Sequence, residues 1–152
     1  MSGVTRWADL DGGLAVLDAS IAVRWIVDEA GSPLANEVMQ RPRQWLAPRL
    51  LVIETANALR RKVGEAAITA TAAEHSLAAL LSAAARNVIA LVDDEEFVVD
   101  ALRIALSDAH KLPDCMYVAL AARSGAPLAT ADVRMAELSR ARGIATYLLP
   151  TP

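Results

Sequence analysis

The stretch Leu14-Ala-Val-Leu-Asp-Ala-Ser-Ile-Ala-Val-Arg-Trp25 changes its pattern of hydrophobicity at a single aspartate. Residues 14–17 are all apolar, which is typical of a short strand buried on both faces of a parallel sheet. Beyond Asp18 the apolar residues recur at helical spacing, which predicts a helix over residues 19–29 with Ser20 as its cap. The stretch therefore predicts a strand followed by a helix, with a carboxylate where the strand ends.

The same alternation continues along the chain. Short apolar runs predict further strands at residues 45–47, 88–92, 127–130 and 144–149. Helical spacing, with glycine or asparagine as stop signals, predicts helices at residues 33–40, 48–63, 69–85, 93–109, 114–122 and 133–142. Strands that alternate with helices indicate an α/β sandwich around a mainly parallel sheet, preceded by an N-terminal extension over residues 1–13.

The composition fits one domain with an aliphatic core. The chain has 152 residues, of which 55% are hydrophobic and only 4% aromatic, and this length is enough for one core. The single cysteine, Cys115, excludes an internal disulfide and is expected in that core. No apolar run approaches the roughly 20 residues of a membrane span, and acids at positions 9, 11 and 18 are wrong for a secretory signal. We therefore expect a cytoplasmic protein that does not enter a membrane.

Four carboxylates are placed where parallel sheets bind their ligands. Asp18 and Asp132 directly follow predicted strands, whereas Glu54 and Asp114 lie in the first turns of predicted helices. Because the carboxyl ends of parallel strands share one edge, these side chains are expected to converge there. Like charges among apolar neighbours raise one another's pKa, and a divalent cation would remove the conflict. Oxygen ligands without a His or Cys cluster favour Mg²⁺ or Mn²⁺, which supports hydrolysis of a phosphodiester.

The sequence around these carboxylates is more specific than their spacing. Val16-Leu-Asp-Ala-Ser20, Glu54-Thr-Ala-Asn-Ala-Leu59, Leu112-Pro-Asp-Cys-Met-Tyr-Val-Ala-Leu-Ala121 and Leu128-Ala-Thr-Ala-Asp132 together resemble the PIN-domain ribonucleases, and more narrowly a VapC-type toxin of a toxin-antitoxin pair. The resemblance covers roughly residues 14–149. It implies a PIN domain over residues 14–152, built as a three-layer α/β/α sandwich with a mainly parallel sheet of four or five strands.

The resemblance also implies an activity and its residues. The expected activity is that of a Mg²⁺- or Mn²⁺-dependent endoribonuclease, which forms a homodimer and is neutralised by a VapB-like antitoxin. The carboxylates implied as catalytic are Asp18, Glu54, Asp114 and Asp132. Asp18 and Asp114 would hold the better-occupied metal, with Glu54 and Asp132 available for a second ion. Supporting polar roles fall to Ser20, Asn57 and Thr130. Pro113, just before Asp114, departs from the family pattern.

The charge pattern leaves an RNA partner open. The net charge is −3, but setting four of the 18 acidic residues aside leaves 14 against 15 basic residues. Six basic residues bracket Glu54, namely Arg41, Arg43, Arg49, Arg60, Arg61 and Lys62. They are interpreted either as a solvated helix end or as a rim that contacts RNA phosphates. His110 is expected to be an ordinary surface or loop residue, and the acidic run 93–96 a solvated helix start.

Two other functional classes compete with the ribonuclease. A PIN-like module that binds RNA or protein without cutting would share the fold, and a turnover assay separates the two. A phosphotransfer receiver or metal phosphatase would share the acidic strand end at Asp18. The sequence speaks against that class, because Ser20 stands where a phosphatase carries its second aspartate and no receiver lysine is evident.

Overall fold

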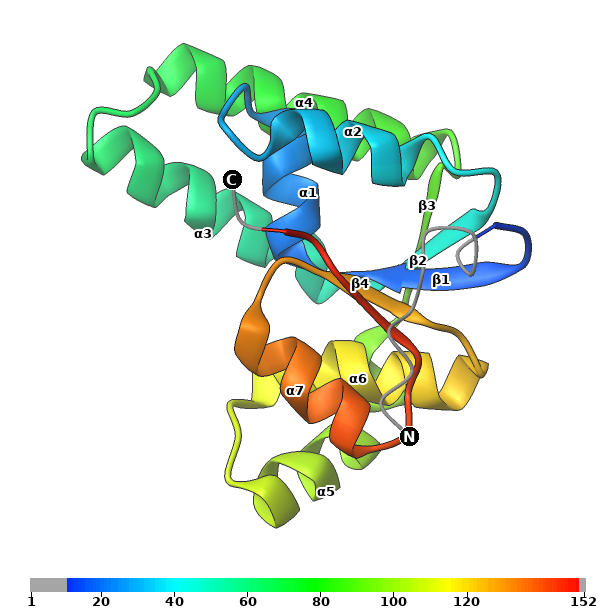
Figure 1. Ribbon diagram of the computed structural model, residues 1–152. Helices are drawn as coiled ribbons and strands as arrows, with labels where there is room; N and C mark the ends of the chain where they lie inside the picture. Colours follow the sequence, from blue (N-terminus) through cyan, green and yellow to red (C-terminus); the bar gives the residue numbers. More distant parts are fainter. Residues whose placement is uncertain (1–10, 151–152) are drawn as a thin grey trace.

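Five parallel strands form the centre of the molecule in the computed structural model, which describes residues 11–150. The strands are β1 (Leu14–Leu17), β2 (Gln44–Pro48), β3 (Ile89–Val92), β4 (Leu128–Thr130) and β5 (Thr146–Leu148). Their order in the sheet is β3-β2-β1-β4-β5, and every neighbouring pair is parallel (Figure 1). The predicted sheet is thus confirmed, whereas the extension over residues 1–13 falls mostly outside the described residues.

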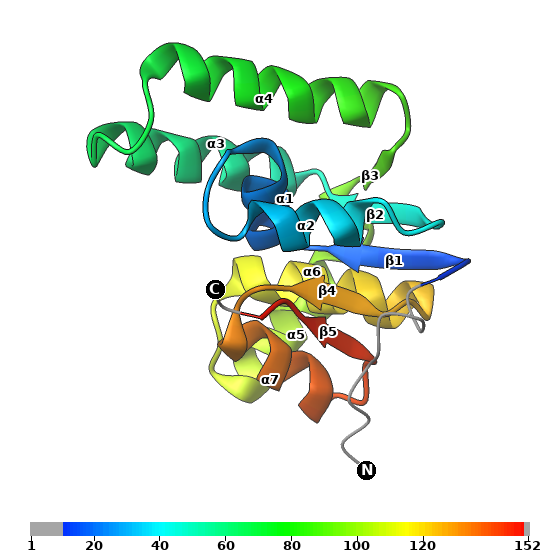
Figure 2. The same cartoon turned by 45° about the horizontal axis from the view of Figure 1, so that its top comes forward.

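Helices cover both faces of the sheet. The helices are α1 (Ala19–Ile26), α2 (Ser32–Met39), α3 (Leu50–Gly64), α4 (Ala70–Ala85), α5 (Val98–Asp108), α6 (Leu112–Ser124) and α7 (Val133–Ala141). Figure 2 shows α1 to α4 on one side of the strands and α5 to α7 on the other. This is the predicted three-layer α/β/α sandwich. Among the helices of residues 11–150, none combines the length and apolar character needed to cross a membrane.

The core is aliphatic, as the composition predicted. Ala15, Val16 and Leu17 of β1 are fully buried because helices pack on both faces of this central strand. Cys115 is also fully buried, in agreement with its expected core position. Trp45 is 1% exposed, which removes it from any surface that could stack on bases.

The strand order places a topological switch point beside β1. From β1 the chain adds β2 and β3 on one side, and then β4 and β5 on the other. In open α/β sheets the connections on either side of such a point diverge, and this opens a crevice at the carboxyl ends of the strands. Here the switch point lies between β1 and β4. The order also differs from the 2-1-3-4-5 order of receiver-type sheets, so the receiver alternative is wrong.

The helix after β1 begins at Ala19 as predicted, but its predicted end and its predicted cap were wrong. The helix after β1 ends at Ile26 and not at residue 29, because Val27 adopts an extended backbone. Ser32 fixes this exit, since its hydroxyl donates to the carbonyl of Val27 and accepts from the amide of Glu29. The N-cap of α1 is also not Ser20. Asp18 occupies that position, and its side chain accepts hydrogen bonds from backbone amides of the first turn.

Two sequence signals near α3 act differently from expectation. Pro48 ends strand β2 instead of opening α3, and it pairs with Val92 of β3. Pairing of β2 with β1 ends at Leu46, so the missing N–H of Pro48 removes no bond on that side. The acidic run is also not simply solvated: Asp94 accepts from the amide of Leu50 and so satisfies one free N–H at the start of α3.

Candidate active site

Asp18 lies at the end of β1 and is 3% exposed. Its Oδ1 accepts from the backbone amides of Ser20 (3.1 Å) and Ile21 (3.3 Å) at the start of α1. Burial raises the pKa of Asp18 from 3.8 to about 6, against the lowering effect of hydrogen bonds from Ser20 and Thr130. The negative charge of Asp132 adds to the rise. Asp18 is thus a buried carboxylate whose described hydrogen-bond partners are all neutral.

Two hydroxyl groups connect the end of β1 to the end of β4. Thr130 Oγ1 donates to Asp18 Oδ2 (2.6 Å) and accepts from the amide of Asp132 (3.0 Å). Ser20 Oγ donates to Asp18 Oδ1 (2.5 Å) and accepts from the amide of Ala131 (2.8 Å). Because each hydroxyl bonds both strand ends, the pair holds the Asp18 carboxylate in a fixed position across the switch point.

Asp132 caps the helix that follows β4. Its Oδ1 accepts from the amides of Arg134 (2.8 Å) and Met135 (3.2 Å), while Oδ2 has no described hydrogen bond. Asp18 and Asp132 therefore both stand at helix N-termini, where the helix dipole favours negative charge. The two helices begin on opposite faces of the sheet at neighbouring strand ends, which explains how residues 114 positions apart influence each other.

Glu54 projects from the second turn of α3 and meets a tyrosine from the opposite layer. Tyr117 of α6 donates its hydroxyl hydrogen to Glu54 Oε1 at 2.5 Å. Burial raises the pKa of Glu54, and the charge of Asp114 adds to that rise, while the Tyr117 hydrogen bond and Lys111 lower it. Burial and the charges of Glu54, Asp18 and Asp114 raise the pKa of Tyr117 well above its usual value. Three of the four carboxylates therefore act on one phenol group.

Asp114 lies inside the first turn of α6 and does not cap it, since Lys111 occupies the N-cap. Its Oδ2 lies 2.8 Å from His110 Nε2, and the two side chains are only 15% and 9% exposed. His110 lies in the loop between α5 and α6, one of the two positions expected for it, but its mostly buried side chain contacts Asp114, which the sequence did not predict. The backbone explains the contact, because Ala109 caps the end of α5 in a left-handed conformation and the chain then turns back into α6.

The four carboxylates gather around one edge without forming a finished metal cage. Within residues 11–150, no three His, Cys, Asp or Glu side chains are already arranged to hold a metal ion. The available donors are nevertheless carboxylate oxygens, the preferred ligands of a hard divalent cation. No Lys or Arg of the described chain forms an ion pair with Asp18, Glu54 or Asp132. In donor chemistry, and in negative charge that no described Lys or Arg ion pair balances, the residues present fit Mg²⁺ or Mn²⁺.

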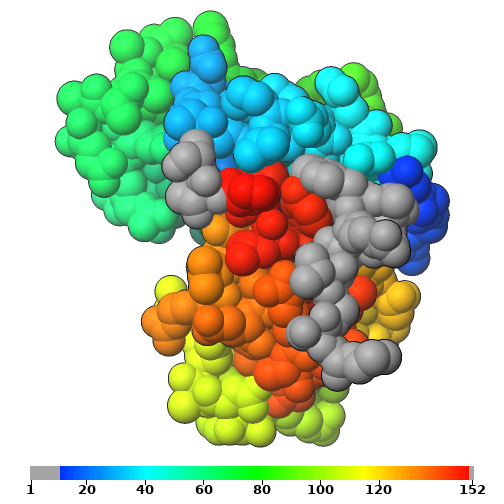
Figure 3. Space-filling model, viewed as in Figure 1, coloured from blue at the N-terminus to red at the C-terminus, as the bar shows by residue number. Residues whose placement is uncertain are grey.

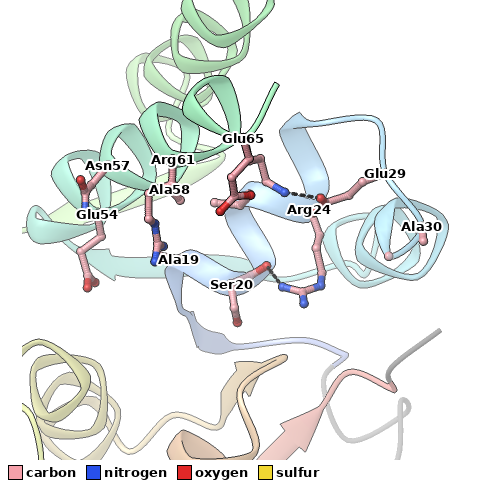
Figure 4. A pocket seen from close by; sticks show the side chains of 13 residues that line it. Ala19, Ser20, Arg24, Glu29, Ala30, Glu54, Asn57, Ala58, Arg61 and Glu65 are labelled. Atoms are coloured by element: carbon pink, nitrogen blue, oxygen red, sulfur yellow. Dashed lines mark hydrogen bonds and ion pairs between the residues drawn. The ribbon is translucent and has the colours of Figure 1, made fainter. Parts of the chain in front are cut away.

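A cavity of about 610 Å³ opens between α1, the loop after it and α3, and of the four carboxylates Glu54 is the one in its lining (Figure 4). Its polar lining includes Ser20, Arg24, Glu29, Glu54, Asn57 and Arg61. Figure 3 shows the molecular surface hollowed between α3 and the segment that follows β4. Asn57 accepts from Arg60 (3.2 Å) and has no described contact with Glu54, although both line the cavity.

The six basic residues around Glu54 do not form a single rim. Arg41 and Arg43 precede β2 and so lie at the amino edge of the sheet, where Arg41 pairs with Asp11. Arg49 and Lys62 are held by Asp93 (2.6 Å) and Glu29 (2.5 Å). Arg61 lines the cavity and has no described hydrogen bond or ion pair within residues 11–150. Arg60 donates to Asn57 (3.2 Å), so Arg61 is the arginine of the predicted cluster that lines the cavity without a described partner.

Sequence reasoning missed Tyr117 and assigned no role to the contact of His110. Tyr117 lies one helical turn after Asp114, and His110 lies four residues before it. Residues three and four positions apart are neighbours on a helix, so this spacing predicts that His110, Asp114 and Tyr117 lie on one side of α6 and the segment that leads into it. That signal was available, but it does not reveal that Tyr117 reaches Glu54, 63 positions earlier in the chain.

Comparisons with known proteins agree with this geometry. The profile of the PIN domain family matches residues 15–141. The fold resembles the crystal structure of PAE2754 from Pyrobaculum aerophilum, with a TM-score of 0.63 and 20% identity over 96% of this chain and 88% of that one. It also resembles a toxin-antitoxin complex from Klebsiella pneumoniae, with a TM-score of 0.57 and 13% identity over 79% of this chain and 88% of the other.

A third solved structure is VapBC-5 from Mycobacterium tuberculosis, described as a member of the VapBC family of toxin-antitoxin systems. Its TM-score is 0.50, with 22% identity over 89% of this chain and 98% of that chain. No curated protein matches the sequence. At these identities the solved structures support the fold.

Proposed function

Since the chain belongs to the PIN domain family, we propose that it is a metal-dependent endoribonuclease that acts as the toxin of a toxin-antitoxin pair. The observation that carries this proposal is the set of acidic side chains at the sheet edge. Asp18 is buried without a described cationic partner, and the charges of Asp132, Glu54 and Asp114 reach it or its neighbour Tyr117. Such an arrangement is costly for an empty site and favourable for one that binds a divalent cation.

Each carboxylate has a proposed part in the reaction. Asp18 and Asp114 would hold the first metal ion, with Glu54 and Asp132 available for a second. Mg²⁺ or Mn²⁺ bound there would supply an activated water and neutralise charge on the phosphodiester. Ser20 and Thr130 keep Asp18 oriented through the hydrogen bonds described above, and Asn57 lines the approach to Glu54. Pro113 fixes the first turn of α6 and thereby the position from which Asp114 projects.

The proposed substrate is single-stranded or looped RNA. The cavity beside Glu54 is open, and Arg61 offers a guanidinium with no described partner to a phosphate group. A flexible strand can bend into a recessed acidic site, whereas a regular duplex presents its phosphates on a convex surface. Arg24 lines the same cavity but already donates to the carbonyl of Ser20 (2.9 Å), so Arg61 is the better candidate for phosphate contact.

Replacing Arg61 by alanine is expected to raise the KM for RNA roughly tenfold and to leave kcat nearly unchanged, because one charge-assisted contact to the substrate is lost. Steady-state cleavage of a fluorescent RNA measures both constants. Arg86→Ala is the matched control, since Arg86 caps α4 and its described side-chain hydrogen bond goes to the carbonyl of Ser82 in the same helix. Equal KM values for wild type and Arg61→Ala would remove Arg61 from the substrate site.

One assay tests the proposed function. The purified chain is incubated with single-stranded RNA and Mn²⁺ or Mg²⁺, with EDTA and with the product of the adjacent small reading frame as separate additions. We expect cleavage that EDTA and a VapB-like antitoxin each abolish. Sedimentation of the same sample tests the proposed homodimer. RNA binding without cleavage would support the alternative, a non-cutting PIN module.

A further inference from the structure

The contact between Tyr117 and Glu54 joins the two helical layers of the sandwich. Tyr117 comes from α6 and Glu54 from α3, which cover opposite faces of the sheet. The tyrosine is 1% exposed, and its hydroxyl donates to Glu54 Oε1 at 2.5 Å. A side chain in the core has therefore placed its only polar group at the acidic edge, where it meets a candidate metal ligand.

The Tyr117 hydroxyl is suited to orienting Glu54. A phenol at neutral pH offers one hydrogen for donation, and here that hydrogen is directed at one carboxylate oxygen. The other oxygen, Oε2, has no described hydrogen bond. Because glutamate has three rotatable side-chain bonds, an unsupported Glu54 on the surface of α3 would sample several directions. A fixed hydrogen bond from the buried phenol removes most of that freedom.

We propose that Tyr117 is a positioning residue that holds Glu54 so that a single oxygen, Oε2, faces the metal site. This rests on the proposed function, and it adds a residue and a mode of ligation to it. Tyr117 does not touch the substrate, but acts through Glu54. Loss of the hydroxyl should therefore weaken metal binding by the same route as loss of the Glu54 carboxylate.

A double-mutant cycle tests this coupling. The affinity for Mn²⁺ is measured by calorimetry and by the electron paramagnetic resonance signal of free Mn²⁺, for wild type, Tyr117→Phe, Glu54→Gln and the double variant. We expect Tyr117→Phe to weaken Mn²⁺ binding roughly tenfold, the loss of one hydrogen bond to a charged group. In the Glu54→Gln background the same change should have almost no further effect. In RNA cleavage, excess Mn²⁺ should restore the kcat of Tyr117→Phe while KM for RNA stays constant.

Tyr147→Phe is the matched control, because Tyr147 is a second mostly buried tyrosine, 6% exposed and placed in β5. Thermal unfolding of each variant shows whether its fold is intact. If Tyr117→Phe binds Mn²⁺ as wild type does, or if its effect adds fully to that of Glu54→Gln, the positioning role is refuted while the ribonuclease proposal stands. If wild type neither binds Mn²⁺ nor cuts RNA, the proposed function itself fails.

Discussion

Replacing Asp18 by asparagine should reduce RNA cleavage by roughly 10³-fold or more and, in the same variant, stabilise the metal-free protein. The activity falls because a neutral amide is a poor ligand for a hard cation, and several kcal/mol of transition-state stabilisation depend on the metal. The fold should persist, because asparagine caps helices as well as aspartate does and can accept the same amide hydrogens at the start of α1.

The stability gain follows from the sign of the pKa change. The folded state raises the pKa of Asp18 from 3.8 to about 6, so the folded protein binds this proton more tightly than the unfolded chain does. The ionised carboxylate therefore lowers the free energy of unfolding at pH 7, by about 2–3 kcal/mol. This loss of stability is complete above pH 6, the pKa of Asp18 in the folded state, and vanishes below about pH 4, its pKa in the unfolded chain. Asparagine removes this loss of stability. The metal-free variant should therefore unfold at a higher urea concentration than wild type at pH 7, but not at pH 4.

Urea unfolding in EDTA at pH 7 and at pH 4 measures this difference. Asp108→Asn is a control of opposite sign, because Arg142 holds the pKa of Asp108 below its usual value. Its charge is favourable in the folded state, so neutralising it should not stabilise the protein. An Asp18→Asn variant that is less stable than wild type at pH 7 would mean that the buried charge carries no cost in the absence of metal.

Addition of Mn²⁺ to the wild-type protein should raise its thermal stability by roughly 5–10 °C once the metal exceeds its dissociation constant about a hundredfold. The folded state alone brings Asp18, Glu54, Asp114 and Asp132 to one edge, so the cation binds it and not the unfolded chain. Binding also relieves the repulsion among these charges. Differential scanning calorimetry with and without Mn²⁺ measures the shift.

The shift should disappear in Asp18→Asn and persist in Glu95→Gln. Glu95 lies in the exposed acidic run between β3 and α5, outside the candidate site. Equal shifts in the two variants would indicate that Mn²⁺ binds elsewhere on the acidic surface. Millimolar Mn²⁺ without any shift in wild type would count against a metal site built from these four residues.

The sequence alone was sufficient to predict the architecture and the edge of the sheet at which Asp18 and Asp132 lie. Mostly apolar runs of three to six residues, alternating with segments of helical spacing, identified all five strands, and parallel strands place their carboxyl ends on one edge. Asp18 and Asp132 directly follow such strands, so their location at this edge could be predicted without coordinates. Their catalytic role remains a proposal.

Only the tertiary structure decided which side chains meet across that edge. Tyr117 reaches Glu54, and His110 reaches Asp114, because α3, α5 and α6 pack at particular angles and depths on the sheet. The basic residues around Glu54 are divided between the two edges of the sheet, because strand β2 separates Arg41 and Arg43 at its start from Arg49 at its end. Periodicity determines which face of an element is buried. Distances between groups on different elements depend on packing, and in this protein the burial of Asp18 and the contact of Tyr117 with Glu54 come from packing alone.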